Sequence, residues 1–176
     1  MVIVGAGPIG LAAIWTARLF SPLCVIVVEK ADGRLRAATQ LGADIVVKPD
    51  DDVLKVVRSV TDGLGADVVL EAVGVPASFE LCLTLVRPGG RVANIGVHGK
   101  PATLHLEELW IRDITITTGL VDTYSIPTLL RMVAAGRIDT ANMITHRFPL
   151  GDIMRAYDAF SQPGQTGTLK VALSRG

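Results

Sequence analysis

Three glycines near the beginning of the chain constrain its fold more than any other feature. Gly5, Gly7 and Gly10 follow the apolar run 2–4 and precede a segment with helical periodicity. Glu29 stands nineteen residues beyond the last of them. A turn of this kind joins a strand to a helix, and glycine lets a pyrophosphate approach the backbone at the helix N-terminus, while a carboxylate after the next strand accepts from a ribose. The spacing therefore predicts a dinucleotide-binding site.

Composition excludes several classes of function. The chain has 176 residues, 49% of them hydrophobic, which suits one globular domain or a domain with an appendage. Lys plus Arg and Asp plus Glu number 17 each, so nucleic acid is not an expected partner. Glycines interrupt the apolar beginning, which argues against a secretory signal or a membrane span. Cys24 and Cys82 lie in apolar runs, and we expect buried thiols in a reducing cytoplasm.

Strand and helix patterns alternate along the first two thirds of the chain. This alternation predicts an α/β fold with a doubly wound, parallel, six-stranded sheet. The expected strands are 2–4, 23–28, 45–47, 67–72, 91–97 and 113–118, and the expected helices are 10–20, 32–41, 51–60 and 78–86. Ser78 is expected to cap the last of these helices, and 88–90 to form the turn before the fifth strand. Beyond residue 119 we expect a short α+β tail with a helix over 125–135, a strand over 144–148, a helix over 152–160 and a strand over 169–173.

The glycine spacing alone is a weak signal, because 18 of the 176 residues are glycine. A strand before it, a helix after it and an acid at the end of the second strand strengthen the interpretation. A glycine-rich turn that only packs a helix on a strand is the alternative. As a ribose ligand, Glu29 favours NAD over NADP. It could instead mark a solvated strand end paired with Lys30 or Arg34, and these two cations keep NADP as the second choice.

Five segments together resemble the coenzyme-binding, C-terminal portion of the medium-chain, zinc-dependent alcohol dehydrogenases. They are GAGPIGLAA, VVEKADGRLRAATQLGAD, GADVVLEAVG, RPGGRVANIGVHG and GTLKVAL, and the resemblance runs over about residues 1–173. It implies a Rossmann fold with strand order 3-2-1-4-5-6. It also implies NAD(P)-dependent hydride transfer between a small-molecule alcohol and its ketone or aldehyde.

The resemblance further implies which residues contact the coenzyme. Gly5, Gly7, Pro8, Ile9 and Gly10 would hold the pyrophosphate; Glu29 would hold the adenosine ribose, with Lys30 and Arg34 beside it; Ala72, Val73, Gly96, Val97, Gly119 and Leu120 would line the nicotinamide end; and Lys170 would reach the pyrophosphate. Family members carry their zinc ligands in a catalytic domain that precedes the glycines. We therefore expect zinc only in that domain, which is absent here, and assign no metal or catalytic residue to this chain.

His98 has two possible roles. His98 could relay a proton near the nicotinamide, but no partner acid is identifiable and an exposed loop histidine is the simpler interpretation. Trp110 is expected to be a packing residue. The predicted division is a Rossmann domain over 1–138 and, over 139–176, a tail that in the family returns to the catalytic domain.

The leading functional hypothesis is the NAD(P)-binding portion of a zinc-type alcohol dehydrogenase, inactive as an isolated chain. The alternative is a non-catalytic dinucleotide-binding or interaction module. In the tail, Phe148, Ile153, Tyr157 and Phe160 would lack their partner domain, and exposed apolar patches favour self-association. We therefore expect a cytoplasmic homo-oligomer joined through strand 113–118 or through the tail, with neither nucleic acid nor membrane as a partner.

Overall fold

The chain folds into two compact units. The computed structural model describes residues 1–119, 123–140 and 143–175. The first unit comprises Met1–Lys30 and Leu35–Leu120, and the second comprises Ala31–Arg34 and Val121–Gly176. The predicted division at residue 138 stays a prediction.

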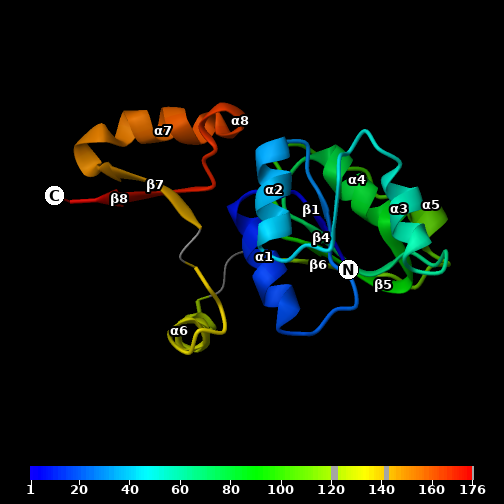
Figure 1. Ribbon diagram of the computed structural model, residues 1–176. Helices are drawn as coiled ribbons and strands as arrows, with labels where there is room; N and C mark the ends of the chain where they lie inside the picture. Colours follow the sequence, from blue (N-terminus) through cyan, green and yellow to red (C-terminus); the bar gives the residue numbers. More distant parts are fainter. Residues whose placement is uncertain (120–122, 141–142, 176) are drawn as a thin grey trace. The chain divides into compact units, whose positions relative to one another are not determined.

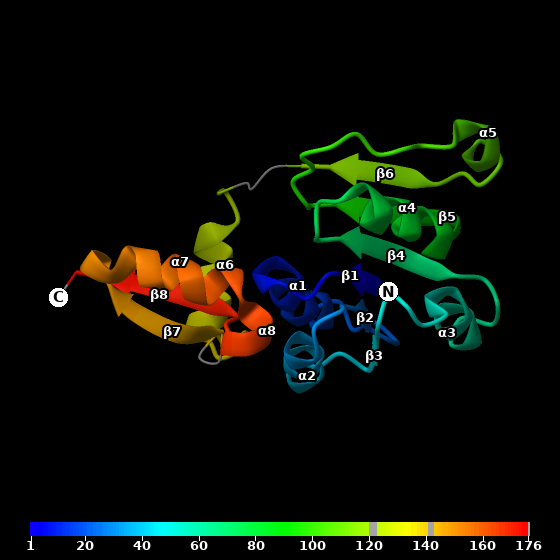
Figure 2. The same cartoon turned by 90° about the horizontal axis from the view of Figure 1, so that it is seen from above.

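A six-stranded parallel sheet forms the centre of the first unit (Figure 1, Figure 2). Its strands are β1 (Val2–Val4), β2 (Ile26–Val28), β3 (Ile45–Val47), β4 (Ala66–Glu71), β5 (Val86–Asn94) and β6 (Thr115–Thr118). The order is β3-β2-β1-β4-β5-β6, and all five neighbouring pairs are parallel. The predicted Rossmann order is therefore confirmed, and the chain crosses over between β3 and β4, where the strand order reverses.

Helices cover both faces of this sheet. They are α1 (Pro8–Arg18), α2 (Asp32–Gln40), α3 (Val53–Ser59), α4 (Pro76–Leu85) and the short α5 (Leu106–Leu109). Figure 1 shows α1 and α2 on one side of the strands and α3 and α4 on the other. Alternate side chains of β1 lie on opposite faces of the sheet. Val2 and Val4 belong to the core cluster with residues of α3 and α4, whereas Ile3 lies close to Gly10 of α1. All three β1 side chains are buried, as expected for a central parallel strand.

Some local features of the first unit differ from the expectations. The second strand begins at Ile26 rather than at residue 23, and Leu23 is 97% exposed. Ser78 is the third residue of α4 and not its N-cap, which is Val75, but its hydroxyl contributes to the cap by accepting from the Val75 N–H at 3.4 Å. The Pro-Gly-Gly segment 88–90 lies within β5, where the pairing with β4 shifts register, instead of forming a turn before the strand. The short helix α5, between the fifth and sixth strands, was not predicted.

The second unit contains a small βαβ arrangement. Strands β7 (Ile144–Pro149) and β8 (Lys170–Ser174) pair in parallel, and α7 (Ile153–Ser161) contacts both of them. A 3-10 turn η1 (Leu150–Asp152), a short helix α8 (Pro163–Thr166) and a separate helix α6 (Ile126–Ala134) complete the unit. The predicted strands and longer helices of the tail are found within one residue of their expected ends. The two short elements, η1 and α8, were not predicted.

The two cysteines are free thiols, as expected. Cys82 is fully buried, and burial, with a smaller contribution from the charge of Glu71, raises the pKa of its thiol to about 12. Cys24 is only partly buried and precedes β2 instead of lying in it. Among the described residues, no helix has the length and apolar composition needed to cross a membrane.

Candidate functional site

The glycine loop joins β1 to α1 at the carboxyl edge of the sheet. Gly5 has a φ of +98°, a backbone conformation that favours glycine, and its N–H donates to the Val28 carbonyl at 2.8 Å. A Cβ at Gly10 would lie 1.8 Å from the Gly5 carbonyl oxygen. The first glycine therefore makes the tight turn, and the third allows the helix to pack against it.

Gly7 leaves the amino end of α1 open. A Cβ added at this residue would meet nothing within 4 Å. Gly7 is the N-cap of α1, no side chain caps the helix, and its first turn contains no acidic residue. Pro8 has no N–H, but Ile9 and Gly10 begin the helix with backbone donors that precede its first intrahelical bond, from Leu11 N–H to the Gly7 carbonyl. Open space beside such donors suits a phosphate group.

Glu29 lies directly after β2 and beside the glycine loop. Its side chain is buried, and Oε2 accepts from the Ala6 N–H at 2.9 Å while Oε1 accepts from the Lys30 N–H at 2.8 Å. The alternative of a solvated strand end is therefore wrong, because the carboxylate is held against the loop backbone. Lys30 itself is exposed, and Arg34 lies in the first turn of α2.

Two further loops reach this edge from β4 and β5. Ala72 N–H donates to the Val4 carbonyl at 2.9 Å, and the Val73 side chain lies so close to Gly5 that a Cβ there would be 2.6 Å from it. After β5, Gly96 is in close contact with Gly74, and Val97 is 83% exposed. Consecutive loops at the end of a parallel sheet thus surround one region.

Three further residues were predicted to contact the coenzyme, namely Gly119, Leu120 and Lys170. Gly119 directly follows β6, at the same edge of the sheet. Leu120 lies outside the described residues. Lys170 is the first residue of β8 in the second unit, where its side chain is exposed.

His98 is not the exposed loop histidine of the simpler interpretation. Its side chain is only 19% exposed, and its Nε2 lies 2.9 Å from Asn94 Oδ1 and 3.5 Å from Glu71 Oε2. An acidic neighbour therefore exists, although it is 27 residues away in the sequence. Adjacent parallel strands end at the same edge of a sheet. The contact could therefore have been predicted from the acid that ends β4 and the polar residues after β5.

The other histidines and Trp110 do not join this region. His105 is exposed and pairs with Glu107 at 2.7 Å, and this carboxylate raises the pKa of His105. His146 contacts Thr145 in the second unit. Trp110 is 76% exposed, so its expected packing role is wrong within the described unit. No group of three metal-ligating side chains exists among the described residues, so these residues do not fit a zinc site.

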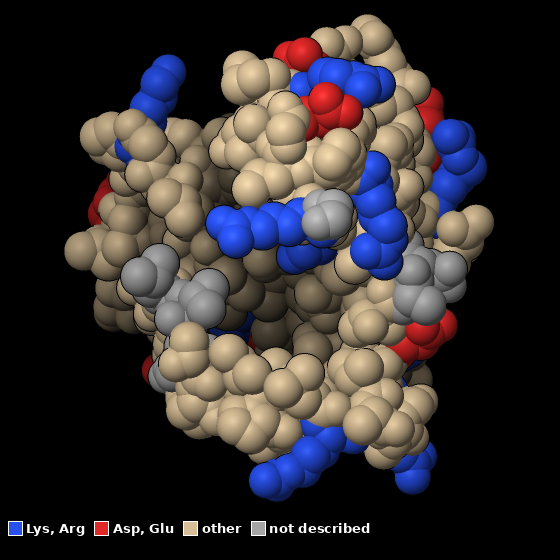
Figure 3. Space-filling model, turned by 90° about the vertical axis from the view of Figure 1, so that its left-hand side faces the viewer, with Lys and Arg blue, Asp and Glu red and all other residues tan. Residues whose placement is uncertain are grey.

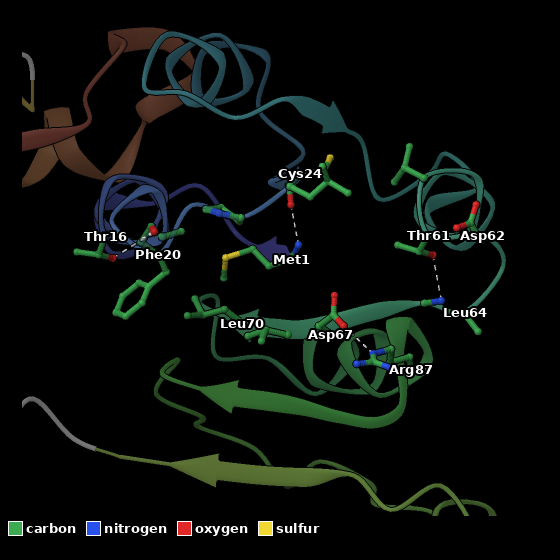
Figure 4. Close-up of a pocket in the computed structure, with 17 residues that line it drawn as sticks. Met1, Thr16, Phe20, Cys24, Thr61, Asp62, Leu64, Asp67, Leu70 and Arg87 are labelled. Atoms are coloured by element: carbon green, nitrogen blue, oxygen red, sulfur yellow. Dashed lines mark hydrogen bonds and ion pairs between the residues drawn. The ribbon is translucent and has the colours of Figure 1, made fainter.

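A pocket of about 660 Å³ opens at the opposite edge of the same sheet (Figure 4). Met1, Cys24 and Asp67 line it near the amino ends of β1, β2 and β4, together with Phe20 and Leu64. Ligands of doubly wound sheets bind outside the carboxyl ends of the strands, so this pocket is not the candidate coenzyme site. On the face drawn in Figure 3, charged side chains form small separate groups, with no extended basic surface.

Comparisons with known proteins agree with this geometry. The family model described as zinc-binding dehydrogenase matches residues 8–135. The chain belongs to the zinc-binding dehydrogenase family. The resemblance inferred from the five sequence segments is thereby confirmed.

Individual members of the family show how much of a dehydrogenase this chain represents. It is 34% identical to an alcohol dehydrogenase of Cupriavidus necator over 98% of its own length and 48% of that enzyme. It is 35% identical to the L-threonine 3-dehydrogenase of Pyrococcus horikoshii, over 98% of the chain and 51% of the relative. The structure of zinc-dependent alcohol dehydrogenase 2 from Streptococcus pneumonia superimposes with a TM-score of 0.94 at 40% identity, covering 99% of this chain and 52% of that one. The chain thus spans about half the length of these dehydrogenases and corresponds to their coenzyme-binding part.

Proposed function

We propose that this chain binds NAD at the carboxyl edge of its six-stranded sheet, as the coenzyme-binding half of an NAD-dependent alcohol dehydrogenase. The observation that carries the proposal is the open, uncapped amino end of α1 at Gly7, beside the buried carboxylate of Glu29. The pyrophosphate would lie against the backbone over Gly5–Gly10, and the adenosine ribose would lie beside Glu29. The turns at 72–74 and 96–97 would face the nicotinamide.

NAD is the proposed coenzyme rather than NADP because of Glu29. A carboxylate accepts hydrogen bonds from both ribose hydroxyls and repels a 2′-phosphate. Its Oε2 accepts from the Ala6 N–H and its Oε1 from the Lys30 N–H, so the carboxylate is held at the end of β2 beside the glycine loop. Lys30 and Arg34 stand nearby in sequence and could receive a 2′-phosphate if that carboxylate were removed.

The substrate of the complete enzyme would be a small alcohol, with its ketone or aldehyde as the product. Bound NAD supplies the hydride acceptor for such a reaction. The described residues hold no zinc-ligand set, so the steps in which a metal polarises the alcohol are not assigned to them. By itself the 176-residue chain should bind the coenzyme without oxidising alcohols. Its free thiols favour the cytoplasm as its location.

The first prediction concerns Glu29. In calorimetric titrations, wild-type chain should bind NAD more tightly than NADP, and Glu29→Ala should weaken NAD binding by about tenfold while reducing the preference. Glu108→Ala, at an exposed residue of α5, is the matched control and should leave both affinities unchanged. If wild-type chain binds neither nucleotide at millimolar concentration, the proposed function fails. Tighter binding of NADP would refute the choice of coenzyme alone.

The second prediction is self-association. β6 is an edge strand, and an edge presents unpaired backbone groups to a second chain. Close to it in sequence, Leu106, Trp110 and Ile111 are between 64% and 76% exposed. In the second unit, Tyr157 and Phe160 are exposed as well. Light scattering at micromolar concentration should give at least twice the chain mass of 18.6 kDa, and a monomer mass would reject the proposal.

A further inference from the structure

A buried carboxylate ends strand β4. Glu71 is completely inaccessible to solvent, and its Oε1 accepts from the N–H groups of Val73 at 2.9 Å and Gly74 at 2.8 Å. The hydroxyl of Ser78, in the first turn of α4, lies 2.5 Å from the same oxygen. Glu71 therefore fixes the turn between β4 and α4 through three donors.

Asn94 and His98 form a second set of contacts at the end of β5. The Asn94 side-chain amide donates to the Gly96 carbonyl at 3.1 Å, and its Oδ1 lies 2.9 Å from His98 Nε2. Because an amide oxygen can only accept, this geometry requires the proton of His98 on Nε2. Phe79 of α4 packs edge-on against the imidazole, with ring centroids 6.1 Å apart. The His98 imidazole thus closes the loop over residues 94–98.

The two loops are in direct contact. A Cβ at Gly96 would lie 2.2 Å from Glu71 Oε2 and 2.3 Å from the Gly74 nitrogen. A Cβ at Gly74 would lie 2.5 Å from the Val97 carbonyl oxygen. The Gly96 N–H donates to the Glu71 backbone carbonyl at 3.1 Å, and the Gly96 carbonyl accepts from Asn94. With so little free space, the position of the 96–97 backbone depends on Glu71 on one side and, on the other, on Asn94 and its partner His98.

His98 also lies beside an incompletely paired charge. Glu71 Oε2 and His98 Nδ1 are both buried and lack a hydrogen-bond partner among the described residues. His98 Nε2 is 3.5 Å from Glu71 Oε2, beyond hydrogen-bonding distance but close enough to place the positive edge of an N–H toward the carboxylate. A buried polar atom that remains unpaired in a native fold calls for an explanation, and a role in shaping a binding site is one.

We propose that His98 is a positioning residue for the nicotinamide half of the coenzyme, acting through its Nε2–H to hold the Gly96–Val97 backbone against that half. This inference rests on the proposed function, because it requires NAD at the same edge of the sheet. His98 takes no part in the chemistry here and need not touch the ligand. Its imidazole acts by holding the side chain of Asn94, whose amide donates to the Gly96 carbonyl.

The test compares NADH with ADP-ribose, which lacks the nicotinamide, in calorimetric titrations of the full chain. Wild type should bind NADH more tightly than ADP-ribose. His98→Ala should weaken NADH binding by about tenfold and change ADP-ribose binding by less than about twofold. His98→Gln, whose side-chain amide can replace the Nε2 donor, should restore most of the NADH affinity. His98→Asn, which replaces Nδ1 instead, should not.

Further variants separate positioning from general destabilisation. Asn94→Ala removes the acceptor of the same hydrogen bond and should reproduce the selective loss of NADH affinity, even if His98→Ala folds poorly. His105→Ala is the matched control at an exposed histidine of the same unit and should bind both ligands as wild type does. Thermal unfolding of each variant shows which chains are folded.

Each other outcome has a definite meaning. If wild-type chain binds ADP-ribose and NADH equally, or if His98→Ala and Asn94→Ala weaken both ligands equally, the positioning role is refuted while the coenzyme site stands. Rescue by His98→Asn but not by His98→Gln would refute it as well, because Nδ1 would then be the important atom. If wild type binds neither ligand, the proposed function fails, and this inference fails with it.

Discussion

The carboxyl and amino edges of the six-stranded sheet hold their charged side chains in different ways. At the carboxyl edge, Glu29 and Glu71 are buried and accept backbone N–H groups of the loops beside them. At the amino edge, the ion pairs Arg18–Asp44 and Arg87–Asp67 have side chains that are between 35% and 69% exposed. Buried acceptors determine loop shape, whereas exposed ion pairs contribute modestly to stability. The comparison separates the edge proposed to bind the coenzyme from the edge whose charges support the fold.

The largest effect is expected from Gly10→Ala at the carboxyl edge. The new Cβ would lie 1.8 Å from the Gly5 carbonyl oxygen, so the loop and helix α1 would have to move apart. Overpacking of this severity should lower the free energy of unfolding by about 3 kcal/mol. Urea unfolding measures the change.

Gly7→Ala is the matched control for that prediction, because its Cβ has open space around it. Gly7 has extended backbone angles that alanine adopts, so stability should fall by only about 0.5 kcal/mol, the effect of a poorer N-cap residue. NAD affinity should nevertheless fall by about tenfold, because the methyl group fills the space proposed for the pyrophosphate. Equal destabilisation by the two variants would contradict the different roles of the two glycines.

The smallest effect is expected from Asp44→Asn at the amino edge. The Val25 N–H donates to Asp44 Oδ2 at 2.6 Å, and this bond, with a further contribution from Arg18, holds the pKa of the carboxyl below its ordinary value of 3.8. A lowered pKa in the folded state stabilises the fold above pH 4, and that stabilisation is lost as pH falls through the lowered value. Because the pair is partly exposed and screened, the variant should lose only about 0.5 kcal/mol at pH 7.

Unfolding in urea at stepwise lower pH measures this contribution. The difference between wild type and Asp44→Asn should shrink as pH falls below 4, because the wild-type carboxyl then becomes protonated. Asp158→Asn, at an exposed residue of α7, should show no such trend. A difference that is constant across the pH range would mean that the charge of Asp44 does not stabilise the fold.

The order of helices and strands was predictable because hydrophobic runs, and the glycines between them, are local features of the sequence. Their ends were less predictable. Val25 is buried but precedes β2, so the run of apolar residues extends beyond the strand that contains most of it. Within β5, the segment 88–90 has turn composition, and it lies in an irregularity between Val86, which pairs with Ala66, and Arg91, which pairs with Val68. In both segments the pairing with a neighbouring strand determines where the strand begins and ends. A local sequence pattern does not show such pairing.

The glycine loop was predictable from the sequence, but the contact between Glu71 and His98 was not. The glycine signal lies within six consecutive positions of the sequence, whereas Glu71 and His98 come together only because β4 and β5 lie side by side. Ser78 illustrates the same limit. Its position near the start of a helix suggested a capping role, and its hydroxyl does accept from the Val75 N–H, but its contact at 2.5 Å with the carboxylate of Glu71 was not predicted. Residues whose roles depend on tertiary contacts need the fold before they can be interpreted.

The close approach of Gly96 to Glu71 has a consequence for how this domain can change over time. A side chain at position 96 would collide with the carboxylate at 71 and with the Gly74 backbone. A shorter residue at 71 would relieve the first collision, but it would leave the donors of the 72–74 turn without their acceptor. Positions 71, 74 and 96 are therefore expected to vary together in homologous sequences. An engineer who wishes to reshape the nicotinamide end would have to redesign the two loops as one piece.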